Sequence, residues 1–158
     1  MSRKARKFKR HLSPDQKYNS LVVSKFINHI MLNGNKALAS KIFYSAIDKL
    51  EPVSKEKKTS AIDLFYNVIE TLKPKVKMKS RRVGGATYQV PKPLRETESE
   101  MIAMKWLIEA ARSVNGKPMY LSLFNVLSDT IDGRGNALKK KEEMHRTAEA
   151  NKAFAHFA

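Results

Sequence analysis

Cysteine is absent from this chain of 158 residues. Its absence excludes disulfide bonds and thiolate metal sites, and it fits a reducing compartment. Long apolar runs are absent too, because none approaches the ~18 residues that a membrane-spanning helix needs. The basic N-terminus is followed by no apolar segment of the kind that a secretory signal contains. We therefore expect no disulfide, no secretory signal and no membrane partner.

The sequence also lacks the motifs of catalysis and metal binding. The chain has four histidines, which are His11, His29, His145 and His156. No two of them have the spacing that places two metal ligands on one face of a helix. Neither Gly84-Gly85 nor the stretch 133–135 leads into a phosphate-binding loop, and no local signature of a nucleophilic triad occurs. We expect no catalytic residue, no metal and no cofactor, and we expect His145 and Arg146 to contact phosphate or solvent.

Acidic residues are missing from two segments of a strongly basic chain. The chain has 31 Lys+Arg against 15 Asp+Glu, a net charge of +16, and its pI is about 10.1. A pI above about 9 is typical of nucleic-acid-binding domains. Residues 1–12 contain six basic side chains and residues 73–95 contain eight, without one acid in either segment. The rest of the chain is close to neutral, so the sequence predicts a body that carries two cationic extensions.

Apolar periodicity predicts that this body is helical. Val22, Phe26 and Ile30, for example, recur at the spacing of one helix face. Six helices are expected, over about Ser20–Leu32, Lys36–Leu50, Ser60–Leu72, Thr97–Asn115, Pro118–Ile131 and Asn136–Phe157. We expect Pro52 to end the second helix, because proline lacks the N–H that the helix interior needs. We expect Thr97 to cap the fourth helix, in a capping box with Glu100.

The period changes from 3.6 to 2 between the third and fourth helices. Val76 and Met78 alternate with lysines, and Tyr88 and Val90 alternate with polar residues. Gly84-Gly85 between the two runs provides the positive φ angles that a tight turn requires. The pattern predicts a β-hairpin within residues 73–92, with a lysine face on its first strand and Arg81 and Arg82 at its tip.

These patterns together predict a mainly α fold. We expect a six-helix, bundle-like body, a protruding two-stranded β-hairpin and a basic N-terminal arm at residues 1–19, all within a single domain of residues 1–158. Trp106 is expected to pack between helices, and Tyr88 to pack in the hairpin or to stack on a base.

The lysines of the hairpin have two possible roles. Lysines on a strand can protect a sheet edge from aggregation. Eight cations without an acid repel one another unless a polyanion is present, so the pattern favours nucleic-acid binding.

Short stretches spread over nearly the whole chain match one known family. They are Pro14–Tyr18 and Lys25–Asn28, then Ser80–Pro91 (SRRVGGATYQVP), then Ala103–Leu107 with Ala110–Arg112, and finally Asn136–Lys141 with His145–Phe154. In this order they resemble the first helix, the hairpin, the fourth helix and the last helix of the bacterial-type small-subunit ribosomal protein seven family. Long matches in the right order are far more specific than a single short motif.

The resemblance implies a structural protein and no enzyme. It implies a primary binder of small-subunit ribosomal RNA (rRNA) that nucleates assembly of the head domain and lies at the subunit interface near the decoding centre. It places the hairpin near exit-site transfer RNA (tRNA) and messenger RNA (mRNA). The other implied partners are the small-subunit ribosomal proteins nine and eleven, with no homo-oligomer. The implied location is the ribosome, in the cytoplasm or in the matrix of an organelle.

The same resemblance assigns two sets of residues. The implied rRNA-binding residues are Arg3, Lys4, Arg6, Lys7, Lys9, Arg10, Lys36, Lys75, Lys77, Lys79, Arg95, Arg112, Lys139, Lys140, Lys141 and Arg146. The residues implied to lie near tRNA and mRNA are Arg81, Arg82, Val83, Gly84 and Gly85.

The chain departs from the family pattern at two places. Glu98 and Ser99 stand where the family usually has arginines, and the chain stops at Phe157-Ala158 where the family often has an aromatic and basic tail. We therefore assign none of the family's contacts to these two places in this chain.

The alternative interpretation is a free-standing helical regulator that binds DNA or RNA with a basic hairpin wing. An RNA-modifying enzyme would need an acid–base or cofactor site, and the sequence offers none.

Overall fold

The computed structural model describes residues 11–157 and is mainly helical. The elements, in chain order, are α1 (Leu21–Ile30), α2 (Lys36–Glu56), α3 (Ala61–Leu72), β1 (Val76–Val83), β2 (Ala86–Pro93), α4 (Glu96–Arg112), α5 (Met119–Ile131), α6 (Asn136–Ala150) and the short 3₁₀ helix η1 (Lys152–Phe157). Six helices and a two-stranded antiparallel hairpin confirm the predicted fold class. None of the helices within the described range combines the length and apolar character of a membrane span.

The helices surround one cluster of buried side chains to which α1 through α6 all contribute. Its centre is an aromatic group from α1, α2 and α3. The ring of Phe65 lies 5.0 Å from that of Phe26 and 5.2 Å from that of Phe43, both in edge-to-face geometry. Such pairs stabilise a core by about 0.5–1.5 kcal/mol beyond the area that they bury. Trp106 is also buried, which confirms its predicted role in packing.

Two predicted helix boundaries are wrong. Helix α2 continues through Pro52 to Glu56. The missing hydrogen bond of Pro52 would have gone to the carbonyl of Asp48, which is an exposed residue whose backbone water can reach. Helix α4 begins at Glu96, and its N-cap is Arg95 rather than Thr97.

The last predicted helix is shorter than expected. α6 ends at Ala150, and η1 follows it as a separate turn. The side-chain amide of Asn151 donates to the carbonyl of Thr147, at 2.8 Å, and so satisfies a carbonyl at the end of α6. η1 then packs against β2, where the ring of Phe154 lies 5.0 Å from that of Tyr88. This contact confirms a packing role for Tyr88 and bends the C-terminal segment towards the hairpin.

The first described residues lie against α2. The carboxylate of Asp15 accepts hydrogen bonds from the backbone N–H groups of Lys17 and Tyr18 and, at 2.6 Å, from the hydroxyl of Tyr44. Burial, together with this bond to Asp15, raises the pKa of Tyr44 to about 12, so its hydroxyl stays a donor at neutral pH. Residues 15–18 of the predicted arm are therefore fixed against the body, and residues 1–10 lie outside the described part of the chain.

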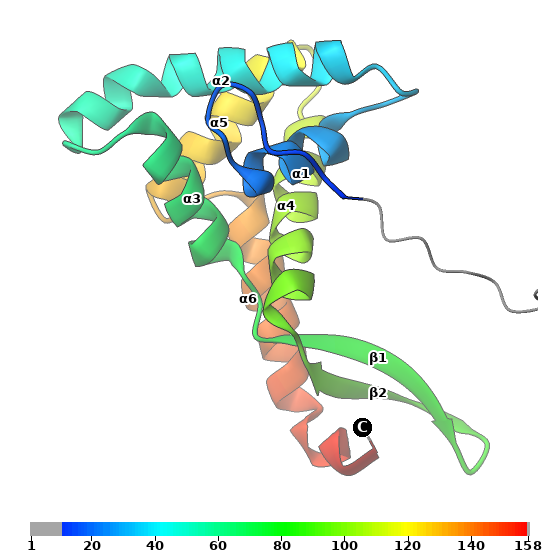
Figure 1. Ribbon diagram of the computed structural model, residues 1–158. Helices are drawn as coiled ribbons and strands as arrows, with labels where there is room; N and C mark the ends of the chain where they lie inside the picture. Colours follow the sequence, from blue (N-terminus) through cyan, green and yellow to red (C-terminus); the bar gives the residue numbers. More distant parts are fainter. Residues whose placement is uncertain (1–10, 158) are drawn as a thin grey trace, which may run out of the picture.

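The hairpin projects from the body beside the lower half of α6 (Figure 1). Its two-residue turn is formed by Gly84 and Gly85, with φ angles of 58° and 88°, as the sequence predicts. This turn fixes a register in which Lys79 faces Val90 and Arg81 faces Tyr88. Facing residues share one side of the sheet. The cationic face of β1 is therefore shared with the apolar residues of β2.

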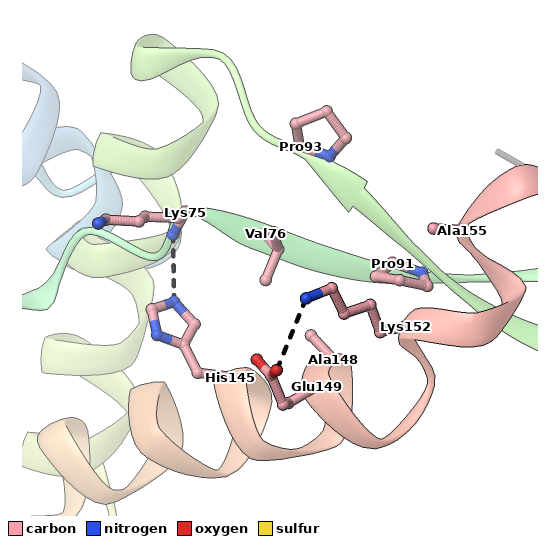
Figure 2. Close-up of a pocket in the computed structure, with 9 residues that line it drawn as sticks. All are labelled: Lys75, Val76, Pro91, Pro93, His145, Ala148, Glu149, Lys152 and Ala155. Carbon is pink, nitrogen blue, oxygen red and sulfur yellow. Dashed lines mark hydrogen bonds and ion pairs between the residues drawn. The ribbon is translucent and has the colours of Figure 1, made fainter.

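Two hydrogen bonds join the backbone of the hairpin root, which we define as residues 73–77, to side chains of α4 and α6. The hydroxyl of Ser99 donates to the carbonyl of Pro74 at 2.7 Å, and this serine is buried. The backbone N–H of Lys75 donates to Nε2 of His145 at 3.2 Å (Figure 2), and the carbonyl of Lys75 accepts from the N–H of Leu94 at 3.1 Å. The ring of His145 is half-buried and accepts this bond from the hairpin backbone, a structural role that the sequence analysis did not predict; its contact with phosphate stays a prediction.

Replacing Ser99 with Ala should destabilise the protein by about 1–3 kcal/mol, because the carbonyl of Pro74 would lose its buried donor. The measurement is the free energy of unfolding from urea denaturation. Ser113→Ala is the matched control, since this exposed serine also donates to a carbonyl, that of Ala110, and its loss should cost less than about 0.5 kcal/mol. Equal losses in the two variants would contradict a special role for Ser99.

The bond between Lys75 and His145 should weaken as the pH falls. Burial, helped by the nearby charges of Lys141 and Lys75, lowers the pKa of His145. A group with a depressed folded-state pKa contributes stability above its unfolded-state pKa, about 6.5 for histidine, and loses it as the pH falls below that value. Protonation also turns Nε2 from an acceptor into a donor. The hydrogen-exchange protection factor of the Lys75 amide, measured by NMR, should therefore decrease from pH 7.5 to 5.5, while ladder amides near Val83 keep theirs. Constant protection at Lys75 would contradict this role of His145.

Candidate nucleic-acid interface

One side of the hairpin, here called the cationic face, gathers basic side chains from both strands. It carries Lys77, Lys79 and Arg81 from β1 and Lys92 from β2. Lys79, Arg81 and Lys92 are exposed and line a hollow whose floor is Val90, itself only 2% exposed. Cations held on a rigid two-stranded ribbon can bind successive phosphates, and such contacts orient a protein on nucleic acid without reading its sequence.

Acidic side chains from the helices reach the root of the hairpin. Nζ of Lys77 lies 2.6 Å from a carboxylate oxygen of Glu98, in the first turn of α4. Nζ of Lys73 lies 2.5 Å from Glu70 and 3.4 Å from Glu96. Residues 73–95 contain no acid of their own, but these helices supply carboxylates to two of the lysines. The cations of the segment are therefore not equivalent.

The titration of these groups reflects the same contacts. The hydrogen bond from Lys77, followed by its charge, lowers the pKa of the Glu98 carboxyl, and Arg95 and Lys92 add to the effect. The hydrogen bond to Glu70 raises the pKa of Lys73. A carboxylate in the first turn of a helix is further stabilised by the helix dipole. Glu98 is therefore ionised at neutral pH and stays bound to Lys77.

Helix α6, whose lower half lies beside the hairpin (Figure 1), carries a second group of cations. Lys139 and Arg146 are exposed. Lys140 forms an ion pair of 2.7 Å with Glu109 of α4, and Nζ of Lys141 donates to the carbonyl of Thr71 at the end of α3. Two of the four predicted cations on α6 thus also hold neighbouring helices together.

The predicted interface residues do not form one patch. Lys36 begins α2 and Arg112 ends α4, at the end of α4 that lies away from the hairpin. A guanidinium N–H of Arg112 donates to the carbonyl of Ile30 at 3.1 Å and so satisfies a backbone acceptor at the end of α1. Arg95 is exposed at the start of α4. The predicted cations of the arm, which are Arg3, Lys4, Arg6, Lys7, Lys9 and Arg10, lie outside the described residues.

The space between the hairpin and α6 is an open hollow of about 370 Å³ (Figure 2). Val76, Pro91 and Pro93 line it from the hairpin, opposite Ala148 of α6. The ammonium group of Lys152 points into this space and lies 3.9 Å from the carboxylate of Glu149. Within residues 11–157, no group of three or more His, Asp or Glu side chains is arranged to hold a metal ion.

The sequence analysis missed the acidic partners of the cations. Glu98 lies 21 residues from Lys77, and Glu109 lies 31 residues from Lys140. No helical or strand periodicity connects residues at such separations. The one available signal was the concentration of Glu96, Glu98 and Glu100 at the start of α4, directly after the acid-free segment.

Known protein sequences are similar to this chain over nearly its whole length. The sequence profile of the family described as "Ribosomal protein S7p/S5e" matches residues 2–152. The protein named small ribosomal subunit protein uS7 from Dichelobacter nodosus (strain VCS1703A) is 48% identical over 157 residues, which cover 99% of each chain. The uS7 proteins of Francisella tularensis subsp. holarctica (strain OSU18) and subsp. novicida (strain U112) are 47% and 46% identical over the same shares. These matches confirm the resemblance found in the sequence. The chain belongs to the ribosomal protein S7p/S5e family, whose members are structural and not enzymatic.

Proposed function

We propose that this protein is a structural constituent of the small ribosomal subunit in the cytoplasm, where it binds rRNA. Its membership of the S7p/S5e family supports this role. The observation that carries it is the cationic face, where Lys79 and Lys92 are exposed and form no ion pair with any of the described residues. Unpaired cations on one rigid ribbon fit a polyanion that runs along the hairpin.

The finer proposal is that the protein is a primary binder of head-domain rRNA and nucleates assembly of the head. Contacts to phosphate are assigned to the exposed cations Lys36, Lys75, Lys79, Arg95, Lys139 and Arg146, and to the six cations of the arm. Lys77, Arg112, Lys140 and Lys141 are proposed as weaker contacts, because each already has a partner within the chain. Selectivity would come from the shape of a folded RNA junction.

The tip of the hairpin is the part of the ribbon farthest from the helical body (Figure 1). It consists of Arg81, Arg82, Val83, Gly84 and Gly85. We assign it to exit-site tRNA and mRNA, at the subunit interface near the decoding centre. Proteins nine and eleven of the small subunit are the proposed neighbours. The single buried cluster shared by all six helices supports the proposal that residues 1–158 act as one domain.

The protein should bind a folded fragment of the rRNA head domain tightly and should resist competition by tRNA and by duplex DNA. Recognition of shape favours the folded rRNA fragment, whereas attraction by charge alone would let rRNA, tRNA and duplex DNA bind equally well. The measurement is fluorescence anisotropy at moderate salt with each competitor in turn. Equal binding to all three would contradict the proposal and favour a free-standing regulator.

Replacing both Arg81 and Arg82 with Ala should leave rRNA binding and head assembly intact and should weaken the retention of exit-site tRNA. The two guanidinium groups lie at the tip, away from the contacts that fix the hairpin root. The measurement is tRNA retention on reconstituted small subunits, after sedimentation has established that the variant is incorporated. A variant that does not support head assembly would contradict this division of roles.

A further inference from the structure

We propose that Glu98 withholds Lys77 from RNA and thereby determines which cations of the hairpin bind phosphate. The inference rests on the proposed function, because it concerns the RNA-binding face of the same hairpin. Glu98 is then a specificity-determining residue: it removes Lys77 from the cations of the hairpin that bind phosphate and leaves Lys75, Lys79 and Lys92 in that set.

The geometry places Glu98 where it competes directly with phosphate. β2 is followed closely by α4, and the N–H of Leu94 still pairs with Lys75, so the first turn of α4 lies against the beginning of β1. Nζ of Lys77 and the Glu98 carboxylate are 2.6 Å apart, and 37% and 39% of the two side chains are exposed. Solvent, and therefore an RNA strand, can reach this pair.

A lysine that is already paired contributes little to the salt dependence of RNA binding. An unpaired lysine that binds phosphate releases condensed counterions from the nucleic acid, which sets the slope of log K against log salt. If Lys77 turned to a phosphate, it would leave the Glu98 carboxylate without its closest cation and close to the RNA, where like charges repel. If Lys77 exchanges the Glu98 carboxylate for an RNA phosphate, the number of unneutralised anions at the interface therefore stays the same.

The other cations of the hairpin are arranged differently. Lys79, farther out on β1, and Lys92, directly opposite Lys77, are exposed and have no ion pair with any residue in the range 11–157, and the same holds for Lys75 and for Arg82 on the opposite side of the ribbon. Lys73, at the root, is enclosed by Glu70 and Glu96 with only 17% of its side chain exposed. The acidic groups of α3 and α4 thus neutralise Lys73 and Lys77 and form no ion pair with the other lysines of the hairpin.

The test compares the salt dependence of binding to the rRNA head fragment for five proteins: the wild type, Lys77→Gln, Lys79→Gln, Glu98→Gln and the double variant Lys77→Gln/Glu98→Gln. Lys79→Gln should reduce the slope by about 0.7–0.9, the contribution of one phosphate contact, while Lys77→Gln leaves it unchanged. Glu98→Gln should increase the slope by about 0.7–0.9, so that affinity falls about threefold more between 50 and 200 mM salt. The double variant should return to the wild-type slope.

Two controls separate this mechanism from simpler effects. Glu56→Gln removes the same charge at the end of α2, far from the hairpin (Figure 1), and should leave the slope unchanged. Glutamine at position 98 keeps an oxygen that can accept from Lys77, and thermal melting checks that each variant is folded. A reduced slope for Lys77→Gln, equal to that of Lys79→Gln, would overturn the inference, and so would an unchanged slope for Glu98→Gln. Failure of the proposed function appears separately, as a wild type that does not prefer the rRNA fragment to tRNA and duplex DNA.

Discussion

The orientation of the hairpin depends on the hydrogen bonds at its root. Pro74 and Lys75 bond to side chains of α4 and α6, through Ser99 and His145. These helices belong to the buried core, so the stability of the core determines where the ribbon points. Without these bonds, the antiparallel ladder would hold the two strands together but would leave their direction free. A ribbon of fixed direction can bind a folded RNA without a large loss of conformational entropy.

The electrostatics follow from the same packing. α4, which holds the root, also brings Glu96 and Glu98 to it, and α3 brings Glu70, so Lys73 and Lys77 are neutralised. Farther out, Lys79 and Lys92 form no ion pair with any residue in the range 11–157, and their mutual repulsion would be relieved by a polyanion. The exposed pair of Lys77 and Glu98 contributes only about 0–1 kcal/mol to the stability of the protein. The packing of α3 and α4 against the root thus neutralises two of its lysines while it anchors the ribbon.

The elements themselves follow from local patterns in the sequence. Helical periodicity located all six helices, and the Gly84-Gly85 turn located the hairpin and its tip. The errors occurred where the surroundings of a residue in the folded protein overrode a local sequence rule. Thr97 has the sequence of an N-cap, but pairing between Leu94 and Lys75 continues the extended chain to Arg95, so the helix begins there. Pro52 has the sequence of a helix terminator, but an exposed turn of α2 accommodates it.

The sequence by itself determined the helical body, the hairpin and the excess of positive charge, because periodicity, turn residues and composition are local or additive properties. Only the tertiary structure decided which of the described cations form ion pairs within the chain. Lys77 and Glu98 are 21 residues apart and meet because the hairpin turns back and α4 starts beside β1. His145 reaches Lys75 across 70 residues because α6 packs against β1. Contacts of this kind depend on how elements pack, and no local pattern in the chain encodes them.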